Sequence, residues 1–153
     1  MALDARTLLS AVESHAAASG FFAHINGAHE PKSPPVSGLT CAIWVEQIGP
    51  ARGGSGLNST SARLALFVRL YAPINNTVPD SIDPALMDAL DWLMAAYSGD
   101  FELGGLVRKV DLLGAYGEPL GARAGYLNES GTEYRVLTIT LPLIVNDLWN
   151  QEA

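Results

Sequence analysis

The stretch from Thr60 to Ala72, TSARLALFVRLYA, decides the fold because its side chains alternate in character with a period of two. Such alternation is typical of a β-strand, whose successive side chains point to opposite faces of a sheet. One face is uniformly apolar and carries Ala62, Leu64, Leu66, Val68 and Leu70. The other face is mixed and carries Ser61, Arg63, Ala65, Phe67, Arg69 and Tyr71. We therefore expect a sheet with one face in the core and a second face that is partly exposed or buried by another subunit.

Further strands are predicted on both sides of this stretch. Residues 39–48 are rich in β-branched and aromatic side chains, and a short extended piece precedes them at residues 21–25. Residues 106–112 form another candidate strand. Residues 122–128 and 133–145 are expected to pair as a hairpin, because the turn-forming residues ESGT lie between them. Pro142 within the last strand predicts a sheet edge or a bulge there.

Two helices are predicted. The first covers residues 4–19, with Asp4 as the cap and Gly20 as the stop. The second is expected to open at Asp83-Pro84, with Asp83 as its cap, and to end at Gly99. This order of elements favours one α+β domain over residues 1–153. In it a mixed or antiparallel sheet carries the two main helices on one face, and long loops protrude.

Composition restricts the class of protein. Of 153 residues, 48% are hydrophobic and only 16% are charged, against about 25% in an average domain. The apolar content is too high for disorder, and no apolar run is long enough to span a membrane. The start of the sequence lacks the apolar stretch of a secretory signal. The net charge of -7 and the scattered basic residues argue against a DNA-binding face.

Residue types that carry chemistry are sparse. Cys41 has no cysteine partner and lies in an apolar run, which predicts a buried thiol in a reducing compartment such as a cytoplasm. The three histidines show no metal-ligand spacing. The glycine-rich loop at 52–58 lacks the lysine of a phosphate-binding loop and precedes a strand, so we expect a flexible arm. A Ser-His-Asp arrangement assembled in space stays open, but the expectation is a protein without catalytic residues, metal or cofactor.

Three longer stretches form a pattern that spans most of the chain after residue 36. The first is VSGLTCAIWV at 36–45, continuing through IGPAR at 48–52 into GLNSTSAR at 56–63. The second is MAAYSGDFELGG at 94–105 with VDLLG at 110–114, and the third is PLIVND at 142–147 with Trp149. Together these stretches resemble the tail terminator proteins of long-tailed, siphovirus-type phages that infect actinobacteria.

The resemblance implies a structural role in the virion. Tail terminators form a ring, typically a hexamer, that caps the finished tail tube and stops the addition of tube subunits. The ring also presents a joining surface to the neck or connector proteins of the head, and DNA passes through its lumen without being bound specifically. The implied fold is a small α/β sandwich of sheet and helices. The implied location is the head-proximal end of the tail, after assembly in the host cytoplasm, with no membrane partner.

A head-to-tail ring needs two different contact patches on every subunit. The low charge fraction of the chain is consistent with such buried patches. The candidates for them are the arms at 49–59 and 73–81, the mixed strand face and the tail after residue 145. The candidate contacts to neighbouring copies or partners are Arg52, Gly53, Gly54, Gly56, Asn58, Phe67, Tyr71, Glu118 and Trp149. The candidates for an acidic lumen, which would repel DNA, are Asp88 and Asp91 on the second helix.

Two alternatives stay open at the level of sequence. A head–tail connector or neck protein is also a small ring-forming chain. A small oligomeric enzyme or ligand-binding domain would instead have a deep pocket with convergent polar groups around His24 or the glycine-rich loop.

Overall fold

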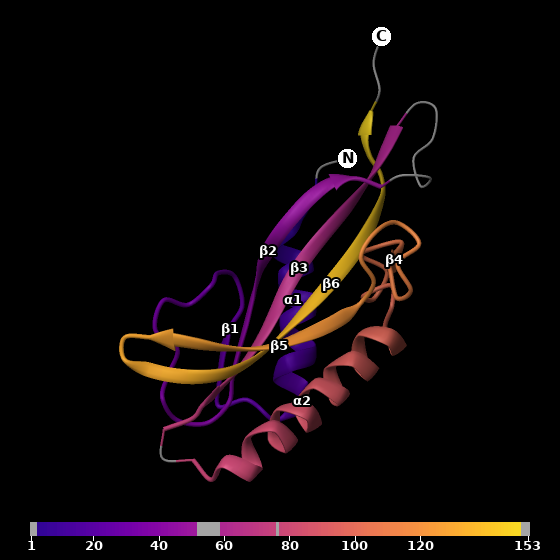
Figure 1. Ribbon diagram of the computed structural model, residues 1–153. Coiled ribbons are helices and arrows are strands. Elements are labelled where there is room, and N and C mark those ends of the chain that lie inside the picture. Colours follow the sequence, from indigo (N-terminus) through magenta and orange to yellow (C-terminus); the bar gives the residue numbers. More distant parts are fainter. Residues whose placement is uncertain (1–2, 52–58, 76, 151–153) are drawn as a thin grey trace.

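The computed structural model describes residues 3–51, 59–75 and 77–150, and its elements follow the α+β order expected from the sequence (Figure 1). Two helices and one mixed sheet make up this described part of the chain. The helices are α1 (Ala5–Ser19) and α2 (Pro79–Gly99). The strands are β1 (His24–Asn26), β2 (Thr40–Pro50), β3 (Ser59–Pro73), β4 (Lys109–Val110), β5 (Gly121–Glu129) and β6 (Thr132–Asn150).

The sheet is built around β3 and β6, its two longest strands. The strand order is β1-β2-β3-β6-β4, and β5 pairs with the same edge of β6 as β4 does, further toward the start of β6. Only the short β1–β2 pair is parallel, and the other pairs are antiparallel. The strands curl strongly, so the β5–β6 hairpin crosses in front of the other strands in Figure 1.

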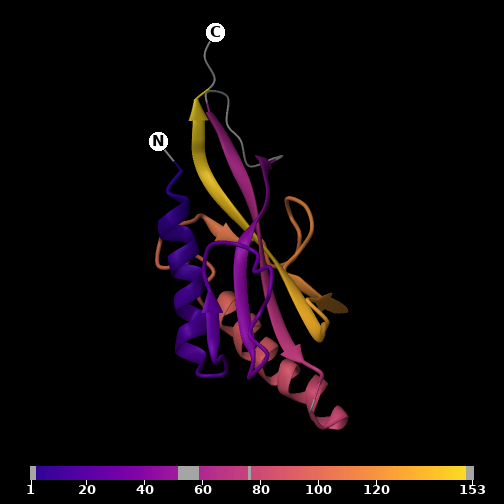
Figure 2. The ribbon, with the colours of Figure 1, turned by 90° about the vertical axis from the view of Figure 1, so that its left-hand side faces the viewer.

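Both helices cover one face of the sheet, and the main core lies beneath them (Figure 2). The uniformly apolar face of β3 is in this core, as the alternation predicts. α1 contributes Leu8, Val12 and Ala16, which recur at helical spacing. Its predicted cap is confirmed, because the Asp4 carboxylate accepts from the Thr7 backbone N–H at 3.2 Å. Gly20 ends the helix in the left-handed conformation.

The prediction for the start of α2 is wrong. The helix begins at Pro79, which occupies its first turn, and Pro84 lies inside it. Asp83 is therefore no cap, and its carboxylate instead accepts from Arg135 Nε of β6 at 3.0 Å. Pro79, five residues before Pro84, suits the first helical turn equally well, and Ile82, which is buried in the core, packs the extra turn against the sheet.

The strand predicted at residues 106–112 is mostly irregular, and β4 is only two residues long. Contact with β6 nevertheless continues on both sides of β4. The N–H of Arg108 donates to the Ile144 carbonyl at 2.8 Å, and the N–H of Asp111 donates to the Pro142 carbonyl at 2.9 Å. Turns at Leu103, Gly104 and Gly105, which have positive φ, redirect the chain before it can pair further.

Pro142 lies neither at a sheet edge nor in a bulge, which corrects that prediction. It sits inside β6 and pairs in regular register with Ala65 of β3. On the other side of β6, β5 stops pairing at Thr140 and β4 starts at Leu143. Pro142 therefore lies at the gap between two partner strands, where the missing N–H interrupts no ladder.

The predicted β5–β6 hairpin is confirmed, with Glu129 paired to Thr132. The two residues between them, Ser130 and Gly131, have φ values of 53° and 80°. Positive φ at both central positions is the requirement of a type I′ turn, whose twist matches that of the flanking strands. In such a two-residue turn the flanking residues form a hydrogen-bonded pair.

A smaller second core covers part of the helix-free face. It consists of Ala42, Tyr71, Tyr134 and Val136, which pack together beneath the loop at 27–38. The Tyr134 hydroxyl donates to the Pro34 carbonyl at 2.5 Å and ties this loop to the sheet. The loop at 27–38 therefore buries the mixed face of β3 at Tyr71, Ser61 and Ala65 are also buried, and Phe67 and Arg69 between them are partly exposed.

Cys41 is fully buried on β2, as predicted. Burial raises the pKa of its thiol to about 12, because the thiolate would lose its hydration. None of the described helices is both long enough and apolar enough to cross a bilayer.

Asp100, just after α2, links the two helices, and its removal is expected to destabilise the fold in a pH-dependent way. Its carboxylate accepts from the Gly104 N–H at 3.0 Å and contacts His15 Nε2 of α1 at 2.9 Å. The Gly104 hydrogen bond first, and His15 second, lower the pKa of Asp100. A lowered pKa in the folded state stabilises the fold above the unfolded pKa, and this contribution is lost as pH falls through the folded value.

Asp100→Asn should therefore lower the free energy of unfolding at pH 7 by less than about 1 kcal/mol, since the carboxylate is 42% exposed. The difference from the unsubstituted protein should shrink as the pH is lowered below about 4. Urea unfolding at several pH values measures it, with Asp91→Asn as the exposed control on α2. A difference that stays constant with pH would rule out the proposed charge contribution.

Candidate functional site

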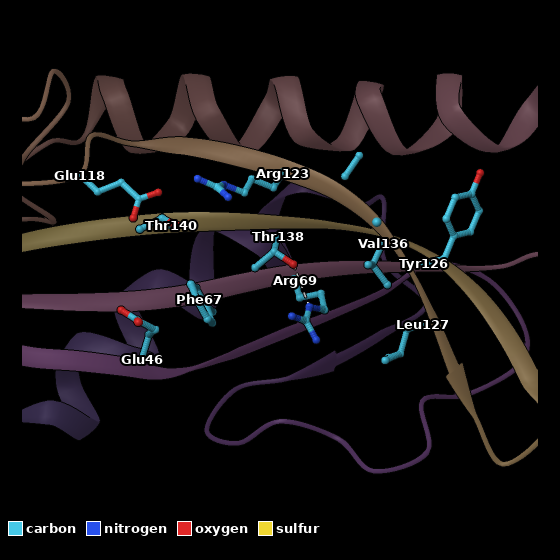
Figure 3. A pocket seen from close by; sticks show the side chains of 12 residues that line it. Glu46, Phe67, Arg69, Glu118, Arg123, Tyr126, Leu127, Val136, Thr138 and Thr140 are labelled. Carbon is cyan, nitrogen blue, oxygen red and sulfur yellow. Dashed lines mark hydrogen bonds between the residues drawn. The ribbon is translucent and has the colours of Figure 1, made fainter.

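A groove of about 510 Å³ lies on the helix-free face of the sheet, where the loop at 27–38 leaves it uncovered. Its floor comes from the two long strands, with Phe67 and Arg69 on β3 and Thr138 and Thr140 on β6 (Figure 3). Glu46 of β2 lies at one side. The remaining wall is formed by Glu118, Arg123, Ala124, Gly125, Tyr126, Leu127 and Val136.

Arg69 makes the floor rigid. Its Nε donates to Thr138 Oγ1 at 2.8 Å, and its Nη1 pairs with Glu30 of the 27–38 loop at 3.3 Å. The guanidinium also lies 5.1 Å from the centroid of the Trp44 ring, within the range of a cation–π contact. These partners already compensate the charge of Arg69, so this side chain is a structural part of the floor.

The exposed charges of the groove are mixed. Glu46 and Glu118 are acidic, and Arg123 is basic. Figure 3 shows the side chains of Arg123 and Glu118 extending toward each other at one end of the groove. Among the described residues no group of three His, Cys, Asp or Glu side chains is placed to hold a metal ion. The exposed side chains of the groove therefore carry both signs of charge.

The loop at 112–120, which carries Glu118, is organised by the buried carboxylate of Asp111. This carboxylate is 1% exposed and accepts from the N–H groups of Ala115 and Tyr116, both at 2.8 Å. The Asp111 carbonyl also accepts from the Leu120 N–H at 3.2 Å. Side-chain capping of a turn in this way satisfies buried backbone donors. Glu118 therefore sits on a loop with fixed geometry.

Arg63 of β3 holds the same loop from below. Its Nη2 donates to the Glu118 carbonyl at 3.0 Å. Gly117 allows this contact, because a Cβ at that position would lie 2.8 Å from Arg63 Nε. Leu113 stands on the loop with 93% of its surface exposed, the most exposed of the large hydrophobic side chains in the described residues. The loop thus presents a leucine to solvent on a preordered backbone.

The sheet has an open edge on each side. β1 covers only Thr40–Ala42 of β2, and no described strand pairs with the outer edge of β2 from residue 43 to 50. β5 pairs with β6 on one side, and no described strand pairs with its other side. Both edges contain consecutive exposed residues, at 45–48 on β2 and 122–124 on β5. Open edges carry backbone N–H and C=O groups that can pair with another chain.

The structure brings two predicted contact residues, Phe67 and Glu118, into the same groove. Phe67 is half-buried and packs edge-to-face on Trp44, with ring centroids 5.8 Å apart. Tyr71 does not fit its prediction. It is fully buried beside Tyr134, because the loop at 27–38 covers that end of the mixed strand face, and it is not available to a partner in this fold.

The other predicted contacts lie apart from the groove. Trp149 is 42% exposed near the end of β6, where it pairs with Thr60. Asp88 and Asp91 are exposed on α2, on the helix-covered side of the sheet. Five of the predicted contacts lie outside the described residues, namely Arg52, Gly53, Gly54, Gly56 and Asn58.

The histidines do not line the groove. His24 is exposed on β1, and His29 lies in the following loop, where its Nε2 is 3.2 Å from Asn26 Nδ2. An open hollow of about 500 Å³ beside His29 also contains Arg6, Ser10 and Glu13. The alternative of a ligand-binding domain expected convergent polar groups around His24 or the glycine-rich loop. His24 does not line the groove, and the glycine-rich loop lies outside the described residues.

Asp111 and Arg123 were not anticipated from the sequence. Asp111 precedes a segment with glycines at 114, 117 and 121, which is the composition of a turn stabilised by an aspartate side chain. That signal was present, but nothing local distinguishes this aspartate from the solvated ones. Arg123 gains its importance only from the position of β5 at the sheet edge.

Comparison with protein-family models and with curated proteins found no match to this chain. The residues and geometry of the groove, the loop and the two edges therefore carry the functional inference, together with the resemblance of the three stretches.

Proposed function

We propose that this chain is a structural virion protein that assembles into a ring, expected to be a hexamer, at the head-proximal end of a phage tail. The ring caps the tail tube, stops further addition of tube subunits and offers the surface to which the neck of the head is joined. DNA passes through its lumen without being bound specifically. The partners are further copies of the chain, the tail tube protein and a neck or connector protein.

The observation that carries this proposal is that the three stretches with the resemblance converge in space. Gly49 pairs with Arg63, Arg63 with Ile144, and Ile144 with Lys109, so one row of the sheet crosses or adjoins all three stretches. We call this part of the molecule the upper end: residues 45–50 of β2, 59–66 of β3, 141–150 of β6 and the segment 100–120. When segments distant in sequence form one surface, we expect that surface to contact a partner.

The upper end is also rich in exposed apolar side chains. Eleven large hydrophobic residues are exposed in the described chain, and six of them lie there. These six are Val45, Ile48, Phe101, Leu106, Leu113 and Trp149. Clustering of exposed apolar residues marks surfaces that contact other proteins. Burial of this surface against neighbours accounts for the low charge fraction of the chain.

The open edges support a ring in particular. An edge of β2 on one side of the sheet and an edge of β5 on the other are two different surfaces. Contacts between unlike surfaces are heterologous, and they generate rings when the rotation between copies closes. A net charge of -7 on every copy would also give a ring with little attraction for DNA phosphates.

Polymerisation of purified tail tube protein in the presence of this chain tests the proposal. We expect tubes that stop growing, with the chain present at one end of each tube in about six copies as judged by electron microscopy and native mass spectrometry. Binding along the sides of tubes, or continued tube growth at saturating amounts of the chain, would contradict the proposal. Binding to the neck complex without any effect on tubes would instead identify a head–tail connector.

A further inference from the structure

We propose that copies of this chain join edge to edge, with the outer edge of β2 in one copy pairing antiparallel with the outer edge of β5 in the next copy. The inference deepens the proposed ring and rests on it. It assigns the interface to two particular strand edges and makes one continuous sheet out of all copies.

The direction of the strands favours this pairing. β2, β3, β6 and β5 are neighbours in that order, and each is antiparallel to the next. An even number of alternating strands means that the first and last run in opposite directions. A second copy placed beside the first in the same orientation therefore sets its β2 antiparallel to the first copy's β5. Repetition of this step preserves the alternation without turning any copy over.

The outer edge of β5 is ready to pair. Because Glu129 and Thr132 form the hydrogen-bonded pair at the turn, alternate residues of β5 direct their backbone groups away from β6. These are Ala122, Ala124, Tyr126 and Asn128. The pairing of β5 with β6 runs without a register shift from Gly121 to Glu129, so no bulge twists this edge away from a partner.

Charge complementarity selects β2 as the partner edge. Glu46 of β2 and Arg123 of β5 are both exposed, and both line the helix-free groove, so they lie on the same face at opposite edges. Neither forms a salt bridge with another described residue. Pairing of β2 with β5 brings a negative charge toward a positive one, whereas β2 with β2 or β5 with β5 sets like charges against each other.

Glu46 also sits in a β-bulge, since the register of β2 with β3 shifts between Val45 and Gln47. A bulge and a charge on an edge strand discourage indiscriminate pairing. Val45 and Ile48, which lie on either side of Glu46, are 44% and 42% exposed. The β2 edge thus combines apolar residues that gain from burial with a charge that restricts the choice of partner.

The register of the sheet is compatible with a closed ring. Arg123 lies in one row with Thr138, Arg69 and Ala42, and Glu46 lies four residues further along β2 than Ala42. Four strands span about 19 Å, and strands of closed sheets tilt by about 35–45° from the axis. Two neighbouring copies at the same height along the ring axis are then displaced relative to each other along the strand direction by about 13–19 Å, or about four to six residues. An offset of this size is what brings Glu46 level with Arg123.

The pairing also determines which face lines the lumen. The helices occupy one face of the continuous sheet and need the larger circumference, so the helix-free groove faces inward. Asp88 and Asp91 on α2 then lie on the outside of the ring. If the edges pair in this way, Asp88 and Asp91 cannot line the lumen.

The variants E46C and R123C, each with one added cysteine besides the buried native Cys41, test the pairing by disulfide formation. Under mild oxidation of the assembled protein, an equimolar mixture should give a covalent heterodimer, with at least about tenfold less dimer from either variant alone. The doubly substituted chain should give a ladder of covalent oligomers. D88C mixed with E46C serves as the control and should stay uncoupled. Homodimers of R123C, or oligomers without any E46C–R123C bond, would overturn the edge pairing while the ring still stood.

Charge exchange gives a second readout that does not depend on oxidation. E46R and R123E should each raise the concentration of half-assembly by about tenfold, and the double variant should return it to within about threefold. Thermal unfolding confirms that each variant folds. Failure of the double variant to recover, with all three folded, would contradict the pairing, and so would absence of any oligomer. Head-to-tail covalent oligomers that leave tube growth unaffected would refute the proposed tail function and leave the edge pairing intact.

Discussion

Replacement of Asp111 by alanine should lower the free energy of unfolding by about 2–4 kcal/mol and release the loop that carries Glu118. The carboxylate is buried and accepts two backbone N–H groups at 2.8 Å, from Ala115 and Tyr116. Hydrogen bonds to a charged group contribute about 1.5–3 kcal/mol each, and water that enters the vacated site recovers part of the loss. Urea unfolding measures the stability, and amide hydrogen exchange at Ala115 and Tyr116 measures the release of the loop.

Two substitutions calibrate this result. Asp111→Asn keeps the size of the side chain but leaves only one oxygen as an acceptor. The amide NH₂ then faces one of the two N–H donors, so this variant should also destabilise the fold. Asp91→Ala on the exposed face of α2 should change stability by less than about 0.5 kcal/mol. An Asp111→Ala variant as stable as the Asp91→Ala variant, with unchanged exchange in the loop, would show that the carboxylate does not organise it.

Proline at Ala124 should weaken assembly strongly and leave the subunit folded. The Ala124 backbone points away from β6, so the substitution removes no hydrogen bond inside the subunit but takes one donor from the outer edge of β5. We expect the concentration of half-assembly to rise by at least about tenfold, measured by analytical ultracentrifugation. The melting temperature should fall by only a few degrees, since proline is tolerated on edge strands.

Proline at the next residue provides the matched control. Gly125 directs its N–H toward β6, so Gly125→Pro breaks the hairpin and should cost about 3 kcal/mol of stability. Ala124→Ser, which keeps the N–H, should assemble normally. Equal loss of stability in the Ala124→Pro and Gly125→Pro variants, or normal assembly of Ala124→Pro, would be incompatible with pairing at this edge.

The sequence was most informative where a single physical signal had no competitor. The alternation in β3 identified its core face, Asp4 and Gly20 marked the ends of α1, and the turn at Ser130-Gly131 located the hairpin. In each case local chemistry and tertiary packing favour the same conformation. Where the two agree, a local sequence pattern is enough to predict the local structure.

Prediction failed where two local signals were equivalent or where the partner was distant in sequence. Pro79 and Pro84 both fit the first turn of a helix, and packing of Ile82 on the sheet selected the earlier one. Pro142 was assigned to an edge or a bulge because its own strand cannot reveal that β5 and β4 leave a gap beside it. Tyr71 was assigned to a contact surface because the loop that buries it lies more than thirty residues upstream.

The candidate site was only partly accessible from sequence for the same reason. Phe67 and Glu118 could be named from exposure patterns, but the groove that joins them requires the pairing of β3 with β6 and the clamp at Asp111. The edges of β2 and β5 depend on strand order, which no local pattern encodes. Arg123 and Glu46 acquire a role only once that order is known.

An electron-microscopy reconstruction of tail ends carrying this protein tests the central claim most directly. The expected result is a closed ring at the head-proximal end of the tube, in which β2 of each copy lies beside β5 of the next, the helices face outward and the groove faces the lumen. A ring at another position in the particle, or copies joined through α1 and α2 with the edges of β2 and β5 left free, would contradict it.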